Sequence, residues 1–325
     1  MATVAGQFFG EHDCNSRLGI NSADALWKWV SDGGAKGFTS SAWTLHPGED
    51  LFFRGQPNVE YGLSSSLYRI CKGRTDPMTG NTVRVDEQTI ARAEQAILDS
   101  MREQGLGRLM TDGELLAVLQ HHGIPTRLID VSTAPLEALF FAVDQEHGVD
   151  GRLFAIHLHC AEGKPMDMEN FAAHDGQAPA ETVLPWQGAA YGKTKTKSEW
   201  TERVALVDQA PLDPRMHAQR GRFLVGGLNK RYGGRSYMVD GLNRPAEDFP
   251  DISTLGVNFL KSTTSKANTH WPATGWTIRV DASWKTDLLG RLASVGITTD
   301  SMYPPHGEVR RLALKVAWDA VAKAE

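Results

Sequence analysis

The densest group of polar side chains in the sequence lies between two apolar runs, in the segment LQHHGIPTRLIDVSTAPLEALFFAV at residues 119–143. The polar residues of this joint are two imidazoles, one guanidinium, one carboxylate and three hydroxyls: His121, His122, Thr126, Arg127, Asp130, Ser132 and Thr133. A rigid apolar frame around a polar joint is how binding sites are usually built. A buried helix–strand corner whose polar groups satisfy one another would have the same composition, so both interpretations stay open here.

A further arginine, Arg54, follows the apolar run Leu51-Phe52-Phe53. The run predicts a short buried strand, and an arginine at its end needs an anion, either a carboxylate of the chain or a ligand phosphate. Gly55 allows a turn or the close approach of a ligand. Taken alone, the pattern favours an internal carboxylate, with Asp130 as the partner of Arg54.

The elements that would position these residues follow from hydrophobic spacing and from capping residues. The predicted helices cover residues 22–30, beginning at Ser22 or Asp24, then 86–101, 111–123 with a Thr111/Glu114 capping box, 133–143 capped by Ser132 or Thr133, 283–296 capped by Ser283, and a last helix after residue 308. The predicted strands cover residues 51–54, 126–131, 151–159, 203–207, 217–225 and 276–280.

The composition is that of an ordinary globular protein: of 325 residues, 41% are hydrophobic and 22% charged. A net charge of −5 argues against broad, sequence-independent DNA binding, which needs a basic face. The three cysteines have neither metal-ligand spacing nor the even count of a disulfide framework. We find no signal peptide and no run approaching about 18 apolar residues. These features predict a cytoplasmic protein without a membrane partner.

Common catalytic signatures are missing from the sequence: it has no P-loop, no G-x-G-x-x-G after a strand, no H-E-x-x-H and no G-x-S-x-G. His157 and His159 alternate along one predicted strand, but no third ligand accompanies them, and we predict no metal site. Helices and strands are mixed without regular alternation, which favours an α+β fold. We expect a loose lead-in at residues 1–20 and a single domain at 21–325, with loop insertions near 161–198 and 226–274.

The sequence resembles the FRG-domain family, which is named for a Phe-Arg-Gly run. The residues that carry the resemblance are Phe53-Arg54-Gly55-Gln56, Ser66-Leu67-Tyr68-Arg69, Gln120-His121-His122-Gly123, Pro125-Thr126-Arg127-Leu128-Ile129-Asp130, Ala138 to Ala142, Asp213-Pro214-Arg215, Ala218-Gln219-Arg220-Gly221-Arg222-Phe223 and Tyr303-Pro304. It covers about residues 20–318. The acidic residues usual after the final proline are replaced by Pro305 and His306, which leaves that corner without its expected role.

The order of parts is also similar to that of ADP-ribosyltransferases. That resemblance implies a mixed, mostly antiparallel split sheet flanked by helices, with Arg54 at the end of the first strand and Phe141-Ala142 on a central helix. It further implies a catalytic glutamate at the beginning of a later strand, for which Glu202 is the first choice and Glu199 the second. An edge-strand carboxylate that pairs with Arg203 or a lysine would be an equally ordinary role for Glu202.

The function implied is that of a transferase that consumes NAD and modifies a nucleic acid or a protein. Arg54 would hold the pyrophosphate, while His121, His122 or Arg127 would hold ribose hydroxyls or another phosphate oxygen. The other residues expected to contact NAD are Gln56, Thr126, Asp130 and Gln219; Gln219 could instead stabilise a turn. A toxin or defence role with an inhibitory partner fits such a family. The alternative is a nucleotide-sensing module that binds without catalysis; a nuclease is disfavoured because no carboxylate cluster suits Mg²⁺.

Overall fold

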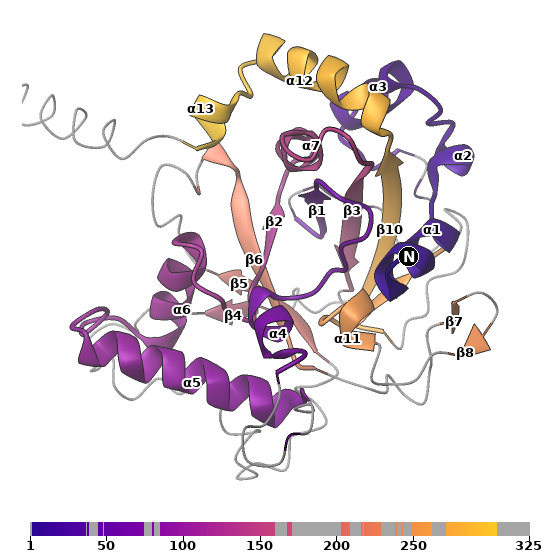
Figure 1. Cartoon of the computed structure of the whole chain (residues 1–325). Coiled ribbons are helices and arrows are strands. Elements are labelled where there is room, and N and C mark those ends of the chain that lie inside the picture. Colours follow the sequence, from indigo (N-terminus) through magenta and orange to yellow (C-terminus); the bar gives the residue numbers. More distant parts are fainter. Residues whose placement is uncertain are drawn as a thin grey trace, which may run out of the picture.

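The structure is a computed structural model with an α+β architecture (Figure 1). It describes residues 2–36, 38, 45–47, 49–74, 80, 85–159, 168–170, 203–208, 216, 218–228, 238–239, 242–243, 249–261 and 271–303.

A curled sheet forms the centre of the molecule, with eight strands in the order β4-β5-β6-β2-β1-β3-β10-β9. The strands are β1 (Leu51–Gln56), β2 (Ile129–Ser132), β3 (Gly151–Leu158), β4 (Met168–Asn170), β5 (Val204–Asp208), β6 (Gly221–Gly226), β9 (Val257–Phe259) and β10 (Ala273–Val280). Neighbours are antiparallel except β4–β5 and β9–β10. The expected mixed, mostly antiparallel sheet is therefore confirmed.

The sheet is nearly split between β1 and β2. These two strands are paired only at Phe53 and Ser132. By contrast, β1 is paired with β3 along its whole length, from Leu51 to Gln56, and β2 with β6 from Ile129 to Ser132. Beyond the single pair, the backbones of β1 and β2 diverge, so polar side chains can enter between two otherwise well-paired half-sheets.

Helix α7 (Pro135–Val143) lies directly against β1 and β3, and two glycines permit this contact. A Cβ atom at Gly55 would lie 1.8 Å from the carbonyl oxygen of Ala138, and one at Gly151 would lie 2.3 Å from that of Ala142. Real Cβ atoms do not approach backbone this closely, so Gly55 is needed for helix packing at this position.

The remaining helices enclose the two faces and one side of the sheet (Figure 1). Helices α3 (Ala23–Ser31) and α12 (Lys285–Ser294) pack with α7 on one side. Helices α5 (Glu87–Glu103) and α6 (Asp112–His121) form a second apolar cluster together with β5 and β6. Shorter helical segments are α4 (Ser66–Cys71), α11 (Phe249–Ile252), η3 (Ala282–Trp284) and α13 (Thr299–Met302).

The expectation of a loose lead-in at residues 1–20 is wrong. Residues Val4–Glu11 form α1 and residues Asn15–Leu18 form α2. Phe8 and Phe9 are almost completely buried, and the ring of Phe9 contacts those of Phe154 and Phe259. The segment therefore belongs to the main apolar core, because its two adjacent aromatic rings are covered by residues distant in sequence.

The expected loop at residues 226–274 is also corrected, because its described residues include α11, β9, the start of β10 and a small hairpin of β7 (Met238–Val239) and β8 (Leu242–Asn243). Of the expected insertion at 161–198, only β4 is described. The helix expected after residue 308 lies outside the described residues.

Most predicted helix starts are confirmed, but two caps are wrong. Ser22 caps α3, and Thr111 and Glu114 form the expected capping box of α6. The strand predicted at 126–131 begins only at Ile129, and the cap of α7 is Ala134, which makes no side-chain cap bond. The hydroxyl of Ser132 instead accepts from the amide of Ala134 and donates to the carbonyl of Gln219. Likewise Asp281, two residues before the expected Ser283, caps the short helix that leads into α12.

Within the part of the chain that the structure describes, no helix is long and apolar enough to cross a membrane. The same residues contain no cluster of three metal-ligating side chains.

Candidate functional site

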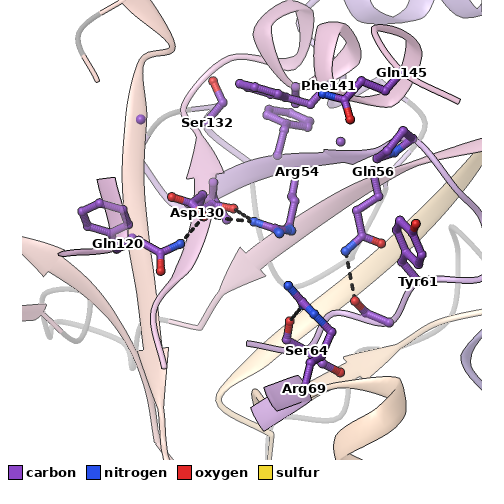
Figure 2. A pocket seen from close by; sticks show the side chains of 18 of the residues that line it. Arg54, Gln56, Tyr61, Ser64, Arg69, Gln120, Asp130, Ser132, Phe141 and Gln145 are labelled. Atoms are coloured by element: carbon purple, nitrogen blue, oxygen red, sulfur yellow. Dashed lines mark hydrogen bonds and ion pairs between the residues drawn. The ribbon is translucent and has the colours of Figure 1, made fainter. Parts of the chain in front are cut away.

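A cavity of about 1470 Å³ lies where the sheet opens between β1 and β2. Strand β1 and helix α7 form one wall, strands β2 and β6 with the end of α6 form the opposite wall, and α4 with residues 60–64 forms a third. Ligand pockets commonly measure about 300–1,000 Å³, so this cavity exceeds the space that a small ligand needs. Its lining contains several charged and amide side chains, which are shown in Figure 2.

Arg54 lies at the opening and is only partly neutralised (Figure 2). Its Nη1 atom donates to the backbone carbonyl of Asp130 at 2.6 Å and lies 3.7 Å from that residue's carboxylate. The buried Nε atom has no hydrogen-bond partner among the described residues. Burial lowers the pKa of Arg54, although Asp130 raises it in part. One edge of the guanidinium fork is therefore available to an additional anion.

Asp130 is fixed by a chain of hydrogen bonds that begins in the preceding helix. The hydroxyl of Thr126 donates to the amide oxygen of Gln120 at 2.7 Å, and the amide nitrogen of Gln120 donates to the Asp130 carboxylate at 2.5 Å. The side chain of Asp130 stays 55% exposed. Thr126 is therefore a supporting residue that does not line the cavity, whereas Gln120 and Asp130 do.

Arg69 brings a second guanidinium to the same cavity. It extends from α4 and donates to the carbonyl of Ser64. Burial lowers its pKa, and the positive charge of Arg54 lowers it further. Arg54 and Arg69 share Asp130 as a nearby carboxylate, so these three side chains form a local group with net positive charge. The sequence pattern Ser66-Leu67-Tyr68-Arg69 contains this residue, but we did not predict it as a site residue.

Arg127 does not reach the cavity. It is 4% exposed and is enclosed by two carboxylates, Glu87 at 2.6 Å and Glu94 at 3.0 Å, both on α5. Although burial alone would lower its pKa, Glu87 and Glu94 raise it. The structure thus separates two arginines that the sequence analysis expected in one cleft: Arg54 lines the cavity and Arg127 belongs to a buried ion cluster.

The other predicted ligand-binding residues do line the cavity. His121 and His122 are at the end of α6, with their rings 5.4 Å apart, and Gly123 follows with a φ of 74°. Gln219 is on the turn that precedes β6, and its amide nitrogen donates to the carbonyl of Met302 at 2.8 Å. This bond joins two segments that are distant in sequence, so it differs from the local turn-stabilising bond considered for Gln219.

Gln56, the last residue of β1, also lines the cavity and is 5% exposed. Its amide nitrogen donates to the carbonyl of Gly62 at 3.0 Å, while its amide oxygen has no partner among the described residues. Tyr61, which precedes Gly62, also lines the cavity and is 46% exposed. Its hydroxyl donates to Glu146 at 2.7 Å.

The predicted catalytic residues, Glu199 and Glu202, lie outside the described residues. The strand that follows them, β5, begins at Val204, which is paired with Gly226 at the far end of β6. The cavity is at the other end of β6, around Gly221, five residues or about 17 Å along the strand. Among described residues, the carboxylates at the cavity are those of Glu60, Asp130, Asp144 and Asp251.

Residues 49–150 match the family model of the FRG domain. The matched segment runs from the start of β1 to the end of the α7–β3 connection, so it contains Arg54, Arg69, both histidines and Asp130. No curated protein and no solved structure matches the chain. The comparison therefore supports the FRG-domain resemblance for this segment, which supplies most of the cavity wall.

Proposed function

We propose that the cavity binds NAD and that the protein transfers ADP-ribose from it to a nucleic acid or protein acceptor. The observation that carries this proposal is the opening between β1 and β2, where Arg54 and Arg69 face a cavity with room for a dinucleotide. The planar fork of an arginine suits the oxygens of a pyrophosphate, and two forks provide donors for both phosphoryl groups.

The other lining residues fit the remaining parts of NAD. Asp130 can accept hydrogen bonds from ribose hydroxyls, because it is exposed and its orientation is fixed by Gln120. His121 and His122 supply further polar contacts on the same wall. Transfer requires that a carboxylate stabilise the positive charge that develops on the ribose as nicotinamide leaves. Glu202 and Glu199 are our proposed residues for this role, with Asp130 as the candidate among described residues.

A second function, nucleotide binding without transfer, is favoured by one specific feature. Gln219 lies two residues before β6 and lines the cavity. Its side-chain amide is already bonded to the carbonyl of Met302. An amide can orient a ligand but supplies no negative charge to a developing cation. A sensor would therefore use the same cavity and retain NAD intact.

The two functions are separated by incubating the protein with NAD labelled in the nicotinamide ring, with nucleic acid or cell extract as acceptor. Transfer predicts release of nicotinamide, and Glu202→Gln should reduce the rate by about 10²–10³-fold if that residue is the stabilising carboxylate. Glu199→Gln and Asp130→Asn test the other two carboxylates in the same way. Binding of NAD without release of nicotinamide under any of these conditions would establish the sensor instead.

A further inference from the structure

The amide oxygen of Gln56 is a buried acceptor beside the cavity that the described chain leaves unused. Its orientation is fixed, because the carbonyl of Gly62 only accepts hydrogen bonds and so requires the amide nitrogen of Gln56 to face it. The oxygen must point the other way, and it has no hydrogen-bond partner among the described residues. A buried acceptor without a donor costs about 1–3 kcal/mol, and such groups are rare in folded proteins.

Two neighbours show what kind of ligand group would supply the missing donor. Tyr61, next to Gly62, presents an aromatic ring that is 46% exposed, and its hydroxyl is bonded to Glu146 at 2.7 Å. Figure 2 shows Gln56 and Tyr61 on the same side of the cavity. An exposed ring next to a hydrogen-bonding amide matches a planar heterocycle with a polar edge, since the ring can stack while the amide reads the edge.

We propose that Gln56, with Tyr61 beside it, receives the amino group of a planar ring in the bound ligand, either the 6-amino group of adenine or the carboxamide of nicotinamide. This inference rests on the proposed binding of NAD and assigns one part of it. Gln56 and Arg54 are on the same face of β1, about 7 Å apart along the strand, so one ligand can contact both residues. The amide oxygen is covered in the ligand-free cavity, so the proposal requires a side chain beside it to move as the ring enters; exposed Tyr61 is the candidate.

The experiment is isothermal titration of the full chain with NAD and two analogues. Nicotinamide hypoxanthine dinucleotide replaces the 6-amino group by an oxo group, and nicotinic acid adenine dinucleotide replaces the carboxamide by a carboxylate. The analogue that lacks the recognised amino group should bind about tenfold to a hundredfold more weakly than NAD, because two acceptors would then face each other. Which analogue is rejected identifies the ring bound at Gln56.

The variant Gln56→Met tests whether this residue causes the discrimination. It keeps the side-chain length but removes the acceptor, so NAD and the rejected analogue should bind within about twofold of each other. Loss of the Gly62 contact affects both ligands equally and cancels in this ratio. Gln145→Met, the same substitution at another amide of the cavity, should retain the full discrimination.

The outcomes separate this inference from the proposed function. Equal binding of NAD and both analogues by the unmodified chain, or discrimination that persists in Gln56→Met, would overturn the role of Gln56 while leaving dinucleotide binding intact. If NAD fails to bind, the titration is repeated with adenosine against inosine and with nicotinamide against nicotinic acid. Discrimination within either pair that is lost in Gln56→Met would support Gln56 and reject the dinucleotide, whereas no binding or no discrimination would overturn the inference.

Discussion

Arg54 and Arg127 belong to two of the segments that carry the FRG-domain resemblance, residues 53–56 and 125–130, and the structure brings these segments together. The two arginines differ in the number of carboxylates that surround them. Arg127 is sealed between Glu87 and Glu94, whereas Arg54 shares one half-exposed carboxylate, Asp130, with neighbouring Arg69. The charge of Arg127 is neutralised inside the protein, whereas Arg54 retains an edge of its guanidinium group for a ligand. Burial alone therefore does not show that an arginine binds a ligand. An arginine with few carboxylates around it is the one that can still bind an anion.

The largest expected effect follows from breaking the Arg127 cluster. Arg127→Met leaves Glu87 and Glu94 as uncompensated buried charges, so we expect the free energy of unfolding to fall by about 3–5 kcal/mol. Arg54→Met removes one partly exposed ion pair, and we expect a loss of about 1 kcal/mol or less. Urea unfolding of both variants measures the difference. Similar losses in the two variants would show that the contrast between the arginines is incorrect.

The sequence contained the signal that distinguishes these arginines, although we did not use it. In the helix predicted at 86–101, the apolar residues Ile90, Ala93 and Ile97 fall at helical spacing and define its apolar face. Glu87 and Glu94 are three positions before and four after Ile90, so they occupy the same face, and both are buried. Carboxylates on the apolar face of a helix require an internal cation, which Arg127 supplies.

The sequence otherwise predicted correctly the helix caps and strands that depend only on neighbouring residues. Caps at Ser22 and Thr111 and the apolar runs of β1 and β3 were correct because they depend on residues within one turn or one strand. The burial of Phe8 and Phe9 depends on Phe154 and Phe259, which are far away in sequence. Arg69 and Tyr61 were likewise missed because only the folded chain brings them to β1.

A second large effect is expected where α7 forms the cavity wall. Gly55→Ala adds a methyl group 1.8 Å from the Ala138 carbonyl oxygen, and the α7 backbone at Ala138 and Ala142 leaves it no space. We expect a loss of stability of about 3 kcal/mol or more and a displaced α7. Gly148→Ala, on a glycine whose added Cβ meets nothing within 4 Å, is the matched control and should change stability by less than about 0.5 kcal/mol.

The affinity for NAD should depend on Arg54 and not on arginines elsewhere. Arg54→Met removes charged hydrogen bonds to the pyrophosphate, so we expect the Kd measured by titration calorimetry to rise about tenfold to a hundredfold. Arg54→Lys should give an intermediate value, because it keeps the charge but loses the planar fork. Arg92→Met, on the exposed face of α5, should not change the Kd. An unchanged Kd for Arg54→Met would remove this residue from the binding site.

A further expected effect, modest at each step of pH, concerns the N-terminal core segment. Burial lowers the pKa of His12 from 6.5 to about 4, and the neutral ring donates from Nδ1 to the Phe8 carbonyl. Because the unfolded chain binds a proton more readily between these two values, stability should fall as the pH decreases from 6.5 to 4. The contribution of His12 is about 1.4 kcal/mol per pH unit in the steepest part.

Replacing this ring checks the pH effect. His12→Phe keeps an aromatic ring against Phe8 and should decrease the slope of unfolding free energy against pH by that amount. The slope that remains should come in part from His157 and His159, whose pKa values burial lowers to about 3 and about 4. An identical slope in His12→Phe would mean that His12 is accessible to protons in the folded chain.

The central claim is that the opening between β1 and β2 holds a dinucleotide through Arg54 and Arg69. The most direct measurement is an experimental structure of the chain determined with NAD. We predict the pyrophosphate between these two guanidinium groups, with N–O distances of about 2.7–2.9 Å, and Arg127 still enclosed by Glu87 and Glu94. NAD bound outside this cavity, or bound inside it without a contact to Arg54 and Arg69, would contradict the account.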